Sequence, residues 1–261
     1  MTEANQLGGE PEKQVEKVAE NLQSTARAET APRAERSLRT ILFQGYVIAA
    51  VSAFLLLAFV ARTTAYFAID LTITKTFQAH DYTLVDYLMR MISWPGFGPQ
   101  SAVIVVLLVF LFYIFGFHWE AAAALIVAVV EGLLNFLVKV IIHRPRPEAN
   151  LVHVFQNVSG FSFPSGHVMF YTAFFGFILF LLFALFRRSY LRTLLLIVFG
   201  ALVLLVGVSR IYLGEHWASD VLGGYLLGSL TLAFAIPFYR WGKTRFFVKQ
   251  PVAAPEGDGK V

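Results

Sequence analysis

The sequence predicts an all-α integral membrane protein: a bundle of six transmembrane helices with an interfacial helical segment between the first two. Of its 261 residues, 57% are hydrophobic and 15% are charged. Soluble domains have roughly 45–50% apolar and about 25% charged residues. Six apolar stretches also approach or exceed the roughly 20 helical residues needed to cross a hydrocarbon core of about 30 Å. The excess apolar surface therefore requires lipid, which excludes the soluble, fibrous and disordered classes.

The predicted spans lie near residues 41–61, 100–117, 120–142, 166–186, 191–212 and 217–239. The first is too long, and starts too far from the N-terminus, to be a cleavable signal peptide. A few residues around Trp119 separate the second span from the third, and Arg187 to Tyr190 separate the fourth from the fifth. Each of these two pairs should therefore form a tight antiparallel hairpin.

Three regions follow from this pattern. Residues 1–40 are polar and lack a sustained apolar stripe, so we expect a disordered tail. Residues 41–240 form the transmembrane domain, and residues 241–261 form a second tail. Between the first two spans, residues 70–93 mix apolar and charged positions, which favours a helix lying in the membrane interface before the turn at Trp94-Pro95-Gly96.

The distribution of basic residues predicts the orientation in the membrane. One side has Arg33, Arg36, Arg39, Arg187, Arg188, Arg192, Arg240, Lys243, Arg245 and Lys249. By the positive-inside rule that side is cytoplasmic, as are both termini. The loops at residues 143–165 and 213–216 then lie on the outer face of a cell inner or plasma membrane. Because the cations stand at the ends of apolar runs and form no single solvated patch, nucleic acid is not an expected partner.

Three polar clusters fall at the predicted outer ends of the spans. They are Lys139 with Arg146 and Pro147; Pro164-Ser165-Gly166-His167; and Ser209-Arg210 with His216 and Asp220. Alone, each has an ordinary explanation: basic residues at a helix end mark topology, Pro-Ser-Gly forms turns, and a His–Asp pair at this spacing is often a surface pair. Together, on one face of a chain that otherwise keeps charge out of its spans, they indicate an active site.

The chemistry of the clusters points to a phosphate. The turn from Pro164 to His167 starts the fourth span, so its free backbone N–H groups form an anion cradle, with the Ser165 hydroxyl and the Gly166 N–H as further donors. Without a bound anion, Lys139, Arg146 and Arg210 would repel one another. A phosphate offers the charge and the acceptor oxygens to match a lysine and two guanidinium forks. Because these cations supply the stabilisation that a metal would otherwise give, we expect neither a metal nor another cofactor.

The two histidines predict the reaction. The spacing of four between His216 and Asp220 places the carboxylate one helical turn from the imidazole, if this segment is helical. A neutral imidazole held by Asp220 can attack phosphorus, so we assign His216 as nucleophile and His167 as general acid. Water activated by His167 would then hydrolyse the phosphohistidine.

At these residues the sequence resembles the type 2 phosphatidic acid phosphatase superfamily. All three family signatures are complete and in order: Lys139 through Arg146-Pro147, Pro164 to His167, and Ser209-Arg210 through His216 and Asp220. The resemblance implies a phosphohistidine mechanism with the same histidine roles, and phosphate binding by Lys139, Arg146, Ser165, Gly166 and Arg210. It also implies a phosphorylated lipid substrate such as phosphatidic acid, phosphatidylglycerophosphate or an isoprenoid diphosphate. The apolar composition disfavours the soluble relatives, which include acid phosphatases and haloperoxidases.

Other readings remain open. The phosphoenzyme could pass its phosphoryl group to a second lipid, which would make the protein a lipid phosphotransferase. A noncatalytic lipid-binding or channel protein would be expected to have broken motifs. Glu131 lies inside a span, where charge is costly, and is a candidate for either a functional role or a structural bond. We assign His143 and Arg144 to the rim of the site.

Overall fold

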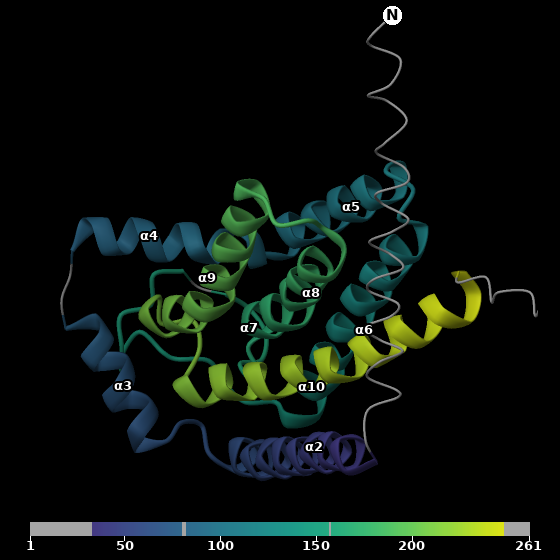
Figure 1. The fold of residues 1–261 in the computed structure, drawn as a ribbon. Helices are drawn as coiled ribbons and strands as arrows, with labels where there is room; N and C mark the ends of the chain where they lie inside the picture. The colour runs from purple at the N-terminus through teal and green to yellow at the C-terminus, as the bar shows by residue number, and fades with distance from the viewer. Residues whose placement is uncertain (1–32, 80–81, 157, 248–261) are drawn as a thin grey trace, which may run out of the picture. The chain divides into compact units, whose positions relative to one another are not determined.

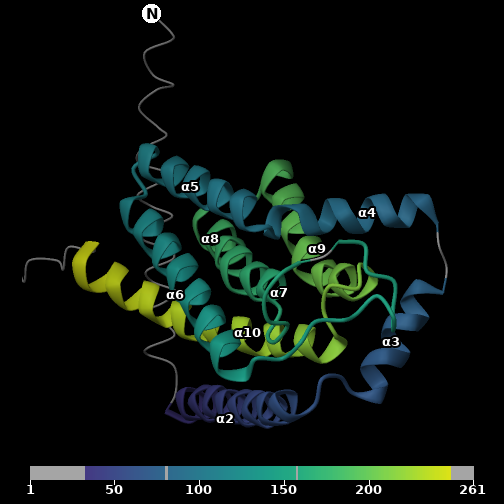
Figure 2. The same ribbon diagram turned by 180° about the vertical axis from the view of Figure 1, so that it is seen from behind.

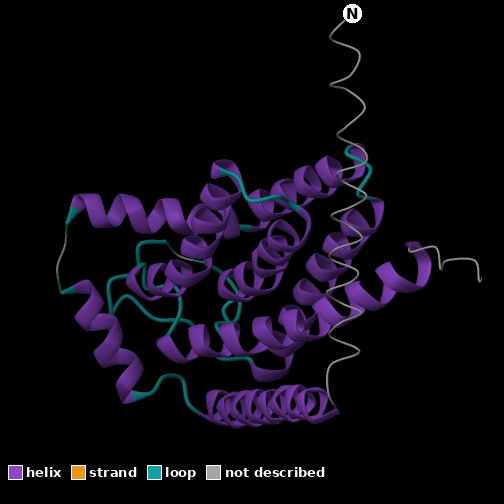
Figure 3. Cartoon of the chain, in the orientation of Figure 1, coloured by secondary structure: helices purple, strands orange, loops and turns teal. Residues whose placement is uncertain are grey.

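The computed structural model describes residues 33–79, 82–156 and 158–247. All regular secondary structure in these residues is helical, which confirms the all-α fold class (Figure 3). The chain divides into two compact units, residues 1–53 and residues 54–261. The described part of the first unit is the beginning of helix α2 (Arg33–Thr63). Most of the predicted N-terminal tail and much of the C-terminal tail lie outside the described residues.

Both predicted tails give residues to helices. Helix α2 begins eight positions before the predicted apolar span, because arginine, alanine, glutamate and leucine in this stretch are good helix formers that need no lipid. At the other end, helix α10 (Ala218–Gly242) continues as η3 (Lys243–Phe247), beyond the predicted boundary at residue 240. The first and last helices therefore extend beyond the apolar segments that predicted them.

Five helices in the described part of the chain are long and apolar enough to cross a membrane. They comprise Ser37–Thr63, His118–Ile142, Gly166–Leu185, Tyr190–Tyr212 and Ala218–Phe247. Helices α6 (His118–Ile142) and α9 (Tyr190–Tyr212) supply the second and fourth of these ranges. All five correspond to predicted spans.

The remaining predicted span, the second in chain order at residues 100–117, does not form a membrane-spanning helix by itself. Helix α5 (Gly98–Ile114) has 17 residues, and it qualifies as a span only together with α4 (Thr83–Ser93) and the short turn η1 (Trp94–Gly96). The two halves of this pair are bent by 60°. Proline within the first turn of η1 and of α5 explains the break, because proline starts a helix well but cannot continue one.

The segment predicted to lie in the membrane interface forms two helices, α3 (Ala68–Gln78) and α4. Asp70 and Thr74 on α3 are fully buried. One face of α3 therefore packs against the bundle, while its position relative to a membrane surface remains a prediction.

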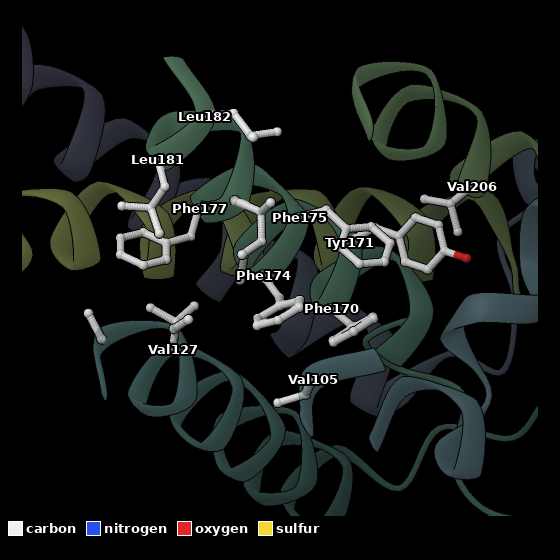
Figure 4. Packing of buried hydrophobic residues seen from close by; sticks show 14 of the residues in the cluster. Val105, Val127, Phe170, Tyr171, Phe174, Phe175, Phe177, Leu181, Leu182 and Val206 are labelled. Atoms are coloured by element: carbon white, nitrogen blue, oxygen red, sulfur yellow. The ribbon is translucent and has the colours of Figure 1, made fainter. Parts of the chain in front are cut away.

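The fourth span forms the centre of residues 54–261. It consists of α7 (Gly166–Phe170), the π-helical turn η2 (Tyr171–Phe175) and α8 (Gly176–Leu185). It lies between α6, α9 and α10 in both views (Figures 1 and 2). In its most apolar segment of 18 residues, 67% is buried inside the protein. Phe170, Phe174 and Phe177 point into the core (Figure 4), so they are packing residues and not lipid contacts.

Glycine allows α10 to approach this central helix closely. A Cβ atom at Gly228 would lie 2.8 Å from the Cβ of Thr172, and one at Gly224 would lie 2.9 Å from the carbonyl oxygen of Ser165. Small residues commonly permit such contacts between membrane helices. The close packing fixes the start of α7 against the start of α10, and these two ends carry the second and third sequence clusters.

Candidate active site

The first cluster provides two cations that have no carboxylate partner among the described residues. Helix α6 ends at His143, which adopts the left-handed conformation at φ 55°. Lys139, in the last turn, donates from Nζ to the carbonyl oxygen of Phe161 at 2.6 Å. Arg146 donates from Nε to the carbonyl of Gly160 at 3.2 Å and from Nη1 to that of Glu215 at 2.8 Å. Carbonyl dipoles thus hold both charges in place without neutralising them.

The second cluster begins the central helix. The backbone N–H of Ser165 donates to the carbonyl oxygen of Asp220 at 3.0 Å, which joins this turn to α10. A Cβ atom at Gly166 would lie 3.2 Å from Oδ1 of Asn135, so a larger residue would crowd the turn. The side-chain atoms Ser165 Oγ and His167 Nε2 are buried and have no hydrogen-bond partner. Buried polar atoms are normally satisfied, and these two therefore indicate a binding position for a polar group.

The third cluster places His216 and Asp220 together, but not in one helix. His216 precedes α10, which begins at Ala218, and the distance from Nδ1 of His216 to Oδ2 of Asp220 is 3.7 Å. That distance is too long for a direct hydrogen bond. The hydroxyl of Ser162 stands between them, 3.4 Å from Nδ1, and it donates to Oδ2 of Asp220. The expected direct contact is therefore replaced by a serine-bridged one.

The other ring nitrogen of His216 faces Arg146. The distance from Nη1 of Arg146 to Nε2 of His216 is 3.2 Å. A guanidinium can only donate, so Nε2 is the acceptor and carries a lone pair. The proton of the neutral ring then lies on Nδ1, toward Ser162. In this tautomer the unprotonated nitrogen, Nε2, faces Arg146, one of the two cations without a carboxylate partner.

Burial and charge both keep the His216 ring neutral. The imidazole is almost fully buried, and burial lowers its pKa well below the ordinary value of 6.5, with further lowering by Arg146, Lys139 and Arg210. A backbone hydrogen bond with Ser162 partly opposes this shift. Burial also lowers the pKa of Arg146, although Asp220 raises it.

Arg210 is less available than the sequence analysis predicted. Its guanidinium pairs with Glu215 and donates to the hydroxyl of Ser93. It lies over the ring of Phe97, 5.5 Å from the centroid. Its Nε atom is buried and has no partner. Pairing with a carboxylate offsets the cost of burying this charge, and the Nε–H remains available to a further acceptor.

Arg144 is not a rim residue, and that assignment was wrong. Its side chain is fully buried and forms ion pairs with Asp220 at 2.6 Å and with Asp70 at 3.0 Å. The left-handed turn at His143 ends α6, and Arg144 follows it into the protein. His143 itself is exposed, as expected of a rim residue, and its ring contacts Phe161. In the sequence, Arg144 is recognisable only as a second arginine beside the first cluster. Nothing in the sequence indicates that Asp70 is its partner.

The break between α4 and α5 covers His167. The ring of Phe97 meets the imidazole edge-on, with centroids 4.8 Å apart. A Cβ atom at Gly96 would lie 2.3 Å from Cδ2 of His167. His167 is also close enough to Arg210, His216, Arg146 and Lys139 to interact with each electrostatically. All three clusters therefore meet at one site. Gly96 and Phe97 form one side of it, which the motifs did not predict.

Glu131 lies outside this site. It is buried on the face of α6 that also carries Asn135, whose Nδ2 donates to the carbonyl oxygen of Pro164 at 3.4 Å. Asn135 thus supports the second cluster, whereas no contact of Glu131 indicates a function.

Comparisons with known proteins agree with this geometry. The model of the PAP2 superfamily matches residues 119–244. Phosphatidylglycerophosphatase B of Bacillus subtilis (strain 168) is 34% identical over 179 residues, which cover 68% of this chain and 86% of that protein.

Two crystal structures are also similar. A transmembrane PAP2 type phosphatidylglycerolphosphate phosphatase from Bacillus subtilis matches with a TM-score of 0.67 and 30% identity, covering 77% of this chain and 98% of that chain. LpxE of Aquifex aeolicus matches with a TM-score of 0.53 and 21% identity, covering 66% and 96%. The second likeness concerns the fold alone.

We predict that Gly96→Ala destabilises the protein, because the added methyl group and the His167 ring cannot both keep their positions. Overpacking of this kind typically costs about 1–3 kcal/mol. Thermal unfolding in detergent would show a lower Tm for Gly96→Ala. Gly98→Ala is the matched control, since its Cβ would meet no atom within 4 Å. Equal Tm values for the two variants would contradict the contact.

We also predict that His216 stays neutral at pH 6.5, where a free histidine is about half protonated. Nitrogen-15 spectra of histidine-labelled protein, assigned with His216→Gln, should show protonation only at lower pH. Lys139→Gln should move the transition to higher pH, because it removes a cation that opposes protonation. A His216 ring that titrates at its ordinary value in both proteins would refute the electrostatic picture.

Proposed function

Because this chain belongs to the PAP2 superfamily and is a lipid phosphatase, we propose that it cleaves a phosphate monoester or diphosphate from a membrane lipid through a phosphohistidine. The observation that carries this proposal is the Nε2 lone pair of His216, held 3.2 Å from Arg146 among cations without carboxylate partners. An unprotonated nitrogen beside an anion-binding position is the arrangement that nucleophilic attack on phosphorus requires.

In the first step, Nε2 of His216 attacks phosphorus and the bond from phosphorus to the lipid oxygen breaks. His167, which is protonated at the start of this step, gives that proton to the departing oxygen and becomes neutral. The positive charge that forms on the His216 ring is stabilised by Asp220 through the hydroxyl of Ser162. In the second step, water attacks phosphorus and gives a proton to His167 as the nitrogen–phosphorus bond breaks. Phosphate leaves, and both imidazoles return to their starting states.

The phosphoryl oxygens are bound by groups that still have a hydrogen-bond donor to offer. We assign this role to Lys139, Arg146, the Ser165 hydroxyl, the Gly166 N–H and the Nε of Arg210. Fixed cations stabilise the charge that develops on the transferred group, so the reaction needs no metal ion.

The substrate class rests on the relatives. Both Bacillus proteins are named for phosphatidylglycerophosphate, which supports a phosphomonoester on a glycerolipid headgroup. Phosphatidic acid and isoprenoid diphosphates carry the same reacting group on other lipids. In each case the headgroup meets the cations while the lipid tail stays in the bilayer, so the substrate enters sideways from the membrane.

The site lies on the outer face in this proposal, with both termini in the cytoplasm. The support is the distribution of arginine and lysine between the two sets of loops.

We predict that the wild-type protein releases phosphate from detergent-dispersed phosphatidylglycerophosphate in the presence of EDTA. His216→Ala should lose at least about 1,000-fold in rate, because removal of a nucleophile abolishes the covalent route. His143→Ala, which removes an exposed histidine near the site, is the control and should keep its activity. Loss of activity in EDTA would overturn metal independence. Phosphorylated lipid product without free phosphate would instead identify a phosphotransferase.

The orientation can be tested by cysteine labelling, because the chain has no natural cysteine. Asn150→Cys is in the loop predicted to face outward, and Tyr190→Cys is in the turn predicted to face the cytoplasm. Both positions are exposed. In intact cells a membrane-impermeant maleimide should label the first and reach the second only after lysis. The reverse pattern would place the site on the cytoplasmic face.

A further inference from the structure

We infer that Arg144 and Asp70 act as a positioning pair that fixes the charge and orientation of Asp220 behind His216. This inference rests on the proposed function, because it concerns how the nucleophile of that reaction is held. Neither residue belongs to the three sequence clusters that predicted the site. Asp70 also lies before residues 119–244, which match the family model.

Arg144 is committed to partners inside the protein, which take four of its five N–H groups. Its Nη1 donates to Oδ1 of Asp220 at 2.6 Å and to the hydroxyl of Ser219 at 2.7 Å. Its Nη2 donates to Oδ2 of Asp70 at 3.0 Å, and its Nε donates to the carbonyl oxygen of Ala65 at 3.1 Å. The side chain is fully buried. Arg144 therefore differs from Arg146, whose charge has no carboxylate partner.

Asp70 is held equally firmly and ties helix α3 to the start of α10. Its Oδ1 accepts from the backbone N–H of Ser219 at 2.8 Å, and its Oδ2 accepts from the Ser219 hydroxyl at 2.7 Å. The N–H of Phe67 also donates to Oδ2, at 3.1 Å. Every one of these donors is local to the first turn of α3 or of α10. The carboxylate can thus fix where α10 begins, two residues after His216.

The remaining oxygen of Asp220 faces the nucleophile. Oδ2 accepts from the backbone N–H of Trp217 at 2.9 Å and from the Ser162 hydroxyl, which contacts Nδ1 of His216. With Arg144 on Oδ1, both carboxylate oxygens are occupied and the group cannot rotate. Arg144 is therefore linked to the imidazole through two intermediates, Asp220 and Ser162, and touches no reacting atom.

Charge explains why both members of the pair are needed. Asp70 and Asp220 share one guanidinium and lie on either side of it, so the buried group carries one excess negative charge. If Arg144 alone were lost, two carboxylates would remain buried close together, and one of them would have to take up a proton. A protonated Asp220 could not stabilise the imidazolium that forms when His216 attacks phosphorus.

The test compares Arg144→Gln, Asp70→Asn and the double variant, using phosphatidylglycerophosphate in detergent. Arg144→Gln should lower kcat by roughly 10- to 100-fold, a loss typical of removing a group that orients a reactive residue, with KM within about 2-fold. The double variant should recover at least several-fold in kcat over Arg144→Gln, because removing the Asp70 charge allows Asp220 to stay ionised. A merely structural defect would be worse in the double variant.

Glu120→Gln is the matched control for loss of a buried ion pair. Glu120 is fully buried and pairs with Lys243 at 2.8 Å near the opposite end of α6 from Lys139. This variant should show a lower Tm with little change in kcat. Thermal unfolding of all variants would separate loss of folded protein from loss of rate.

Each other outcome has a definite meaning. A large rise in KM for Arg144→Gln with unchanged kcat would make Arg144 a substrate-binding residue and overturn the inference. Unchanged kinetics in an active wild-type background, or a double variant no better than the single one, would also overturn it and leave the proposed function intact. A wild-type protein without hydrolytic activity would overturn both.

Discussion

The site depends on how charges are paired where the helices meet. A buried charge without a partner is costly, and most of the charged side chains here are paired: Arg144 with Asp70 and Asp220, and Arg210 with Glu215. Lys139 and Arg146 instead rest on backbone carbonyl oxygens. This division separates the cations that hold the framework together from the cations that remain available to an anion. Together with burial, which is the larger cause, these cations lower the pKa of His216.

Close packing of apolar helices brings the charged side chains of different helices to the positions where they pair. The central span is buried among α6, α9 and α10, and glycines on α10 bring it against the turn that carries Ser165. His167 is then held between this helix and the turn at Gly96 and Phe97. An imidazole confined in this way keeps one orientation. Segments before residue 119, including α3 and the break between α4 and α5, therefore complete a site whose recognisable motifs all lie further along the chain.

Sequence patterns predicted the parts of the site that have a chemical signature of their own. Lys139, Arg146, His167 and His216 stand out because charge and imidazole are rare in apolar spans and gather here at the ends of such spans. Ser162, Asp70 and Gly96 carry no such signature, since serine, aspartate and glycine are ordinary in loops and helix ends. Ser162 and Asp70 matter because they contact residues 54 and 149 positions away, at 3.4 Å and 2.7 Å. Gly96 matters because an added Cβ atom would lie 2.3 Å from His167. Arg144 was misassigned for the same reason, because its partner Asp70 is 74 residues away.

Hydropathy and motif spacing are properties of the chain alone, and they were sufficient to predict the membrane class, the helical spans and the three clusters. The tertiary structure was needed to show which cations are neutralised, that a serine bridges His216 and Asp220, and that α4 and α5 meet at a bend of 60°. Ion pairs and the serine bridge form between segments that are distant in sequence. Local composition does not contain that information.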